Sequence, residues 1–176
     1  MGGENIRNEI DLITMFEIQK LATKKDALRV INFLQSDEAF QDTWVPGEKE
    51  MIRNTVLESL NKSKHHQYWY IEKKGKIIGA LGVNENVYES GGYEMMKDYI
   101  AVHKDYKRHG LGTKLLKTME DYVWLQKGRY ILITTCDTDY YKPARLFYEK
   151  HGYVKVGAIP DYYLVGEGKI DYLKKM

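Results

Sequence analysis

The sequence has a single cysteine, Cys136, and no long apolar run. One cysteine cannot form a disulfide within the chain, and no apolar signal-peptide segment opens the sequence, so we expect a cytoplasmic protein. No stretch approaches about 18 consecutive apolar residues, so we expect no transmembrane helix. The five histidines follow no spacing typical of zinc ligands, so we expect no metal.

The net charge is also small. The 27 Lys and Arg residues stand against 25 Asp and Glu residues, which leaves a formal charge of +2. Such a balance gives no bulk attraction to nucleic acid or to an anionic membrane, and we expect neither partner. A length of 176 residues, 43% of them hydrophobic, suits one compact domain. We therefore expect a single domain over residues 1–176, with a flexible start over residues 1–13.

Hydrophobic periodicity predicts strands interspersed with one-sided helices. Glycine and proline mark several of the expected boundaries, since Pro46 and Pro143 suit first helical turns and Gly152 suits a helix end. The expected elements are a strand at 15–21, helices at 27–34 and 46–60, strands at 67–71, 77–83 and 99–102, a helix at 110–128, a strand at 130–134, a helix at 143–150, and strands at 153–156 and 169–173. This order predicts a mixed α/β fold.

A glycine-containing turn lies between a buried strand and an amphipathic helix. Residues 107–112 read Lys-Arg-His-Gly-Leu-Gly, a context in which main-chain N–H groups can bind a pyrophosphate. A helix dipole contributes only about 0.3–1 kcal/mol, so Lys107 or Arg108 would have to add charge-assisted bonds. A dinucleotide fingerprint would need a glycine in place of Leu115, and the spacing of a P-loop is absent. Taken alone, the hexapeptide is equally compatible with a solvated helix start.

Two segments resemble the GNAT superfamily. The first is the turn itself, because the family motif Gln/Arg-x-x-Gly-x-Gly/Ala has Lys107, Gly110 and Gly112 at its defining positions. The second is residues 144–153, which resemble the family segment Ala-x-x-Phe-Tyr-Glu-Lys-x-Gly-Phe. Residues 100–103 also resemble the strand that precedes the turn in the family. The motifs occur in the family order, and the resemblance covers nearly the whole chain.

The resemblance implies a central, mostly antiparallel sheet of six or seven strands, splayed between the fourth and fifth strands, with about four flanking helices. It implies an N-acetyltransferase that transfers an acetyl group from acetyl-CoA to a primary amine of a small molecule or peptide by direct attack. The family asparagine three residues before Ala144 is replaced by Tyr141, and Asp139 could substitute for it. The cofactor-binding residues implied by the resemblance are Ile100, Ala101, Val102, Lys107, Arg108, His109, Gly110, Leu111, Gly112, Thr113, Asp139, Tyr141, Ala144 and Phe147.

Three residues are candidates for catalysis. Tyr148 stands at the family tyrosine position and could protonate the leaving thiolate, although packing against the sheet would also explain it. Glu94 and Asp98 lie on or beside the fourth strand with the same side-chain parity, and either could deprotonate an ammonium. Solvated charge at a strand edge explains both acids as well, so the base stays unassigned. Main-chain N–H groups near residues 100–102 could stabilise the oxyanion.

The acceptor side is less determined. Residues 159–163 join the last two expected strands and combine aromatic rings with an acid, which suits a cationic amine or a peptide N-terminus. One hypothesis is an acidic acceptor mouth formed by Glu85, Glu89, Glu94, Asp161 and Glu167. A homodimer is left open. The alternatives are a non-catalytic acyl-CoA-binding regulatory domain and a nucleic-acid-binding module, against which the near-zero net charge argues.

Overall fold

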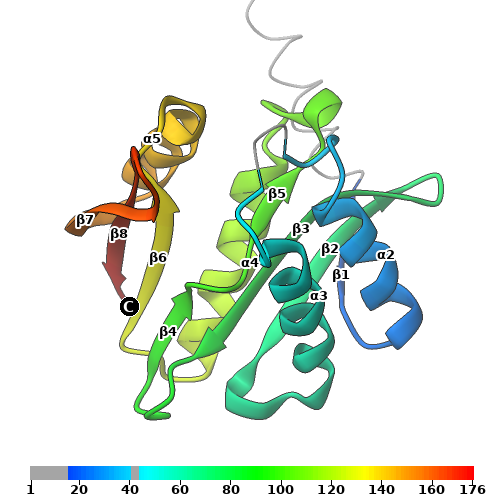
Figure 1. Ribbon diagram of the computed structural model, residues 1–176. Coiled ribbons are helices and arrows are strands. Elements are labelled where there is room, and N and C mark those ends of the chain that lie inside the picture. Colours follow the sequence, from blue (N-terminus) through cyan, green and yellow to red (C-terminus); the bar gives the residue numbers. More distant parts are fainter. Residues whose placement is uncertain (1–15, 41–43) are drawn as a thin grey trace, which may run out of the picture.

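The computed structural model describes residues 16–40 and 44–176 (Figure 1). Their strands form one sheet in the order β1-β2-β3-β4-β6-β8-β7, with β5 paired to β3. The strands are β1 (Ile18–Lys20), β2 (Gln67–Lys73), β3 (Lys76–Glu85), β4 (Gly92–Met95), β5 (Ile100–Val102), β6 (Tyr130–Cys136), β7 (Val154–Leu164) and β8 (Glu167–Lys175). The described α-helices are α2 (Lys24–Leu34), α3 (Glu48–Glu58), α4 (Leu111–Leu125) and α5 (Lys142–Lys150). The expected flexible start at residues 1–13 lies outside the described residues.

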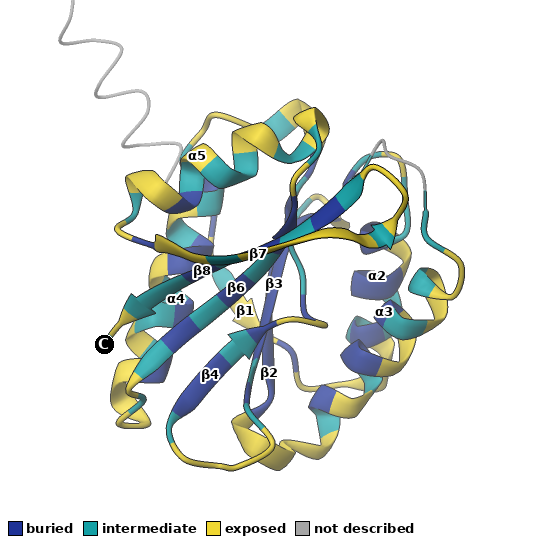
Figure 2. Ribbon diagram, turned by 60° about the vertical axis from the view of Figure 1, so that its left-hand side comes forward, coloured by how far each residue is buried: buried dark blue, intermediate teal, exposed yellow. Residues whose placement is uncertain are grey.

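Two hydrophobic cores lie on opposite faces of the sheet (Figure 2). Helices α2 and α3 cover one face, and the apolar side of α2 is fully buried at Ala27, Val30 and Leu34. Helix α4 covers the other face with Leu115, Met119 and their neighbours, as its four-residue repeat predicts. Because strands β2 and β3 lie between these layers, both are buried along almost their whole length.

The β2–β3 hairpin is confirmed. Its two-residue turn contains Lys74 and Gly75, with φ angles of 48° and 80°. Left-handed angles at both positions match the right-handed twist of the flanking strands. The turn therefore brings the two most buried strands together locally.

The expected fourth strand, at residues 99–102, is β5, and it is preceded by a strand that we did not expect, β4, and by a break that positions the site. Strand β4 pairs in parallel with β6, from Gly92 opposite Tyr130 to Met95 opposite Ile133. After the break at residues 96–99, β5 remains antiparallel to β3 and has no ladder with β6. The sheet therefore opens between β5 and β6, which confirms the expected splay, and the additional strand β4 gives the described sheet eight strands.

The last hairpin is longer than the sequence indicates. We expected strands at 153–156 and 169–173, but β7 continues to Leu164 and β8 begins at Glu167. Residues 159–163 consequently belong to β7 instead of a connecting loop. The register shifts between Ile159 and Leu164, and Asp161 has a φ of 51°, so this half of β7 is distorted.

None of the described helices combines the length and the apolar character that a membrane span requires.

Candidate active site

A cavity of about 480 Å³ lies where β5 and β6 diverge. Figure 1 shows the C-terminal strands and α5 separating from β5 on this side of the molecule. The break at residues 96–99, the end of β6 at residues 133–136 and the start of α3 at residues 45–48 line it. Helix α5 contributes Tyr148, and β7 contributes Tyr163. The opening of the sheet thus creates a cavity close to both segments that resemble family motifs, residues 107–112 and residues 144–153.

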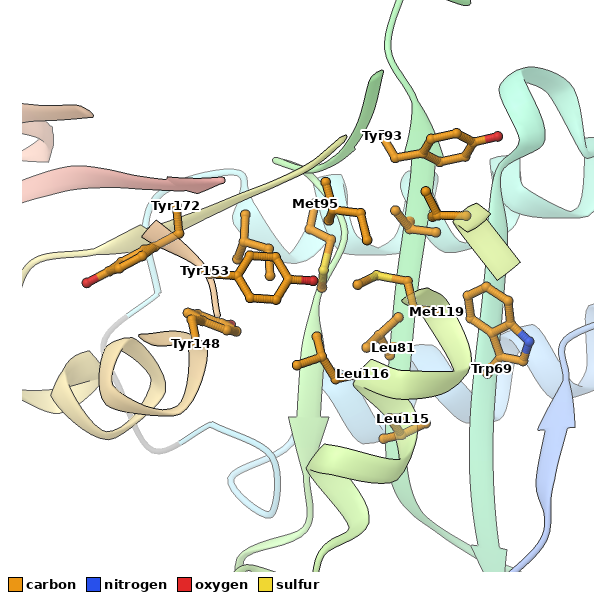
Figure 3. Close-up of a cluster of buried hydrophobic side chains, with 14 of the residues drawn as sticks. Trp69, Leu81, Tyr93, Met95, Leu115, Leu116, Met119, Tyr148, Tyr153 and Tyr172 are labelled. Carbon is orange, nitrogen blue, oxygen red and sulfur yellow. The ribbon is translucent and has the colours of Figure 1, made fainter. Parts of the chain in front are cut away.

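Tyr148 lies in the wall of this cavity, as the motif comparison predicted for a catalytic acid. Its side chain is buried, with ring centroids 6.2 Å from Tyr153 and 6.0 Å from Tyr172 (Figure 3). Its side chain contributes to the cavity lining. Burial raises the pKa of Tyr148 above its ordinary value, so the phenol stays protonated well beyond neutral pH. A fixed ring with an available proton therefore faces the opening.

The structure separates the two candidate bases. Glu94 is half-buried on β4 opposite Asn84 and does not line the cavity. Asp98 lies in the break and lines it, but its side chain is 0% exposed and bonds to His66 Nε2 at 2.8 Å. The expected common parity of the two acids is wrong, because the break at residues 96–99 interrupts the strand.

The glycine turn lies at the start of α4. Gly110 is the N-cap residue, has a φ of 75° and provides no side-chain cap, so the first main-chain N–H groups of α4 remain open to a ligand. Lys107, Arg108 and His109 before it are exposed. Leu111 is buried in the core and can offer a ligand only its main chain. These features fit a pyrophosphate.

Strand β5 connects this turn to the cavity. A Cβ atom added to Gly112 would lie 3.8 Å from a methyl of Val102, whereas Ile100 at the other end of β5 lines the cavity. Tyr99 and His103 bond to β3, so the alternation of an antiparallel ladder turns the N–H groups of Ile100 and Val102 toward the opening. The side chain of Ala101, the middle residue of β5, is buried. An extended thioester arm could pair with this free edge.

Helix α5 forms the opposite side of this route. Tyr141 and Ala144 line the cavity, whereas Phe147 packs 3.5 Å from the position that a Gly112 Cβ would occupy. Thr113 Oγ1 at the start of α4 lies 3.1 Å from His151 Nε2, which ties the two helices together.

Asp139 does not reach the cavity. It begins the short helix η4 (Asp139–Tyr141), where it is exposed. The structure therefore gives no cavity contact for the residue expected to substitute for the family asparagine.

Several lining residues were missed from the sequence. Phe40, Glu48 and Met51 come from the first helical layer, which no motif connects to the turn. Tyr99 was expected only as part of a buried strand. The acidic mouth does not form at the cavity, because Glu167 is the one member of that group lining it in the described structure. Glu85, another residue of that group, is instead buried and bonds to His65 Nδ1 at 2.9 Å.

Within residues 16–40 and 44–176, no three His, Cys, Asp or Glu side chains come together in a way that could hold a metal ion.

A family model described as an acetyltransferase (GNAT) domain matches residues 64–155. The chain belongs to the GNAT acetyltransferase family. The matched segment includes the break, the glycine turn and Tyr148, so the family features coincide with the cavity and its approach.

Similar proteins include the Xenopus tropicalis protein named "Probable N-acetyltransferase camello", 25% identical over 107 residues, which are 61% of this chain and 46% of that protein. The chain thus spans about half the length of this curated relative. A GNAT-family protein from Desulfovibrio desulfuricans superposes with a TM-score of 0.76 at 24% identity, covering 91% of this chain and 98% of that one. An aminoglycoside 6'-N-acetyltransferase complexed with coenzyme A superposes with a TM-score of 0.69 at 17% identity, covering 90% and 96%.

Proposed function

We propose that this GNAT protein is an N-acetyltransferase that uses acetyl-CoA to acetylate a primary amine. The observation that carries the proposal is the placement of Tyr148 in the wall of a cavity that the free edge of β5 connects to an open helix start. The acetyl-CoA thioester would supply the activated acyl group. Residues 107–113 would hold its pyrophosphate, and β5 with α5 would guide its arm.

In the proposed reaction the neutral amine nitrogen attacks the thioester carbonyl carbon. A C–N bond forms, the C–S bond breaks, and the thiolate takes its proton from Tyr148. The main-chain N–H of Ile100 faces the opening and is our candidate donor to the developing oxyanion. The proton that the amine nitrogen loses must then reprotonate the Tyr148 phenolate, which completes the proton balance.

The structure supports positioning as the main contribution to catalysis. Glu94 lies away from the cavity and the Asp98 carboxylate is fully buried, so neither acid is placed to take that proton directly. We propose that it leaves through water. Holding an amine and a thioester together can contribute about 7–11 kcal/mol, which leaves a modest requirement for base catalysis.

A non-catalytic acyl-CoA-binding domain remains the second candidate. The placement of the two candidate bases favours this second function, because Glu94 does not line the cavity and the Asp98 carboxylate is fully buried. Turnover decides between the two functions: release of CoA that depends on an added amine supports the enzyme, whereas binding without release supports the regulatory domain.

The first experiment is calorimetric titration with acetyl-CoA of the wild type and a Gly112→Glu variant. Gly112 is a better position than Gly110 for this side chain, because Gly110 has a φ of 75° and would be strained by any substitution. A Cβ at Gly112 meets Phe147 only at ordinary contact distance, so Gly112→Ala is the matched control. Micromolar binding that Glu abolishes and Ala retains supports the site. Absence of binding by folded wild type contradicts the proposal.

A further inference from the structure

The wall of the cavity facing Tyr148 and β5 is mainly aromatic and thioether-lined, and from it we infer the acceptor class. We infer that the acceptor is a small primary monoamine whose single ammonium is carried on an aliphatic or aromatic body. This inference rests on the proposed acetyl transfer. The wall comprises Phe40, Met51, Met96, Tyr99, Tyr162 and Tyr163, and we call it the aromatic wall.

The rings of the aromatic wall are fixed by contacts with one another. Tyr99 meets Phe40 edge-on with ring centroids 5.6 Å apart, and Tyr162 meets Tyr163 in the same way at 5.0 Å. Burial, and next the hydrogen bond to Glu48, raise the pKa of Tyr99, and burial raises that of Tyr163. Both phenols are therefore neutral at physiological pH. A wall of this kind binds hydrocarbon by burial and attracts an ammonium through ring faces, and the Lys169 ammonium already lies 5.2 Å from the ring centroid of Tyr162.

The carboxylates around the cavity are largely occupied. Glu48 accepts a hydrogen bond from the Tyr99 hydroxyl at 2.7 Å on one oxygen and from the Val45 N–H at 3.0 Å on the other. The Asp98 side chain is fully buried, with Oδ1 bonded to His66 and Oδ2 without a hydrogen-bond partner among the described residues. What remains in the lining is one acid, Glu167, and one base, Lys97.

This balance disfavours acceptors with several positive charges. A polyamine or an aminoglycoside would place further ammonium groups against uncharged rings, which compensate the desolvation of an ammonium less well than a carboxylate does. A volume of about 480 Å³ must also accommodate the acetyl group, which leaves room for a small body only. A monoamine with one apolar chain or ring satisfies both conditions.

The test measures CoA release with a series of primary alkylamines from methylamine to hexylamine. Members of the series carry the same single charge, so differences in kcat/KM report burial of the chain. We expect kcat/KM to rise about fourfold for each methylene that becomes buried, until the wall is covered. Spermidine, kanamycin and an alanine-starting peptide should each react at least about tenfold more slowly than hexylamine.

Two variants locate the effect. Tyr163→Ala should flatten the dependence on chain length and lower kcat/KM for hexylamine about tenfold or more, because it removes one ring of the wall. Tyr163→Phe keeps the ring and should retain the dependence. Tyr88→Ala, at a side chain that is 82% exposed on the β3–β4 connection, is the control. None of the three should change the KM for acetyl-CoA.

The outcomes separate this inference from the proposed function. Faster release of CoA with spermidine, kanamycin or the peptide than with hexylamine overturns the inference and leaves acetyl transfer standing. If no amine releases CoA, calorimetry of hexylamine against the CoA-loaded protein still tests the wall: binding that exceeds spermidine binding and is lost in Tyr163→Ala supports it, and no such binding overturns it. Failure of acetyl-CoA itself to bind contradicts the proposed function.

Discussion

The Nε2 atom of His66 lies 2.8 Å from Oδ1 of Asp98, and the two side chains are 8% and 0% exposed. His66 precedes β2, and Asp98 lies in the break between β4 and β5. The buried pair therefore holds the break at residues 96–99 in place. The cavity opens where this segment turns away from β6. Burial and the nearby charge of Asp98 raise the pKa of Tyr68, whose hydroxyl lacks a hydrogen-bond partner in the described structure.

Asp98→Ala should destabilise the fold and the cavity together. It leaves the His66 imidazole buried without its partner, which costs about 1–3 kcal/mol in the free energy of unfolding, and more if the ring is charged. Urea unfolding measures the loss. Asp121→Ala is the control, because the Lys117–Asp121 pair is 73% and 62% exposed and should contribute little.

A double-mutant cycle identifies the cause of that loss. If the hydrogen bond is responsible, the double variant with Asp98→Ala and His66→Ala should lose less unfolding free energy than the two single variants lose in sum. Additive losses would show that His66 and Asp98 act independently, and the pair would then not fasten the break.

Tyr148→Phe should abolish most acetyl transfer while leaving acetyl-CoA affinity and the fold intact. The variant removes only the hydroxyl and keeps the ring that packs against Tyr153 and Tyr172. We expect kcat to fall about 10²- to 10⁴-fold, the usual contribution of a positioned acid. CoA release measures kcat, and calorimetry measures affinity. Unchanged turnover would remove Tyr148 from the mechanism.

Alkaline pH should destabilise the protein through its buried tyrosines. Burial, with the Glu149 hydrogen bond second, raises the pKa of Tyr172 from its ordinary value of about 10 to about 12. The unfolded chain thus loses this proton first as pH rises, so the folded state is penalised between about pH 10 and 12. Stability from this group is complete below pH 10. Tyr172→Phe should therefore show a shallower decline in unfolding free energy across that window, measured by urea unfolding at successive pH values.

The control for this pH effect is Tyr88→Phe, an exposed tyrosine whose loss should leave the slope at its wild-type value. Tyr172→Phe also loses the 2.8 Å bond to Glu149, so a constant deficit of about 1 kcal/mol is expected at pH 8. Equal slopes for wild type and Tyr172→Phe would contradict the prediction.

Local patterns predicted the parts of the fold that local forces determine. The four-residue apolar repeat of α4 and the proline and glycine limits of α5 appear directly in the sequence, as does the Lys74–Gly75 turn. The length of β7 was missed because most of its residues are exposed, so the strand carries no clear alternation, and Pro160 within it favours a loop.

The break and the acceptor wall depend on distant partners. Asp98 appears as an exposed acid in the sequence, because its partner His66 is 32 residues away. Tyr99 likewise owes its place in the cavity to Glu48, which is 51 residues earlier. The motifs therefore point to the proposed cofactor route and to Tyr148, whereas the proposed acceptor wall required the tertiary structure.

Arg108→Gly should raise stability and weaken acetyl-CoA binding at the same time. Arg108 has a φ of 65°, a left-handed conformation that costs a side-chain-bearing residue about 1–2 kcal/mol. Glycine removes that strain but adds freedom to the unfolded chain, so we expect a net gain of up to about 1 kcal/mol in the free energy of unfolding, measured with urea.

The exposed guanidinium of Arg108 is proposed to contact the pyrophosphate, so its loss should raise the Kd for acetyl-CoA several-fold and reduce the dependence of Kd on salt. Lys74→Gly relieves similar strain, at a φ of 48°, in the β2–β3 turn, which is not part of the proposed phosphate site, and should leave the Kd unchanged. If both variants bind acetyl-CoA like the wild type, the strained arginine has no part in holding the phosphates, and the site would depend on main-chain groups and Lys107.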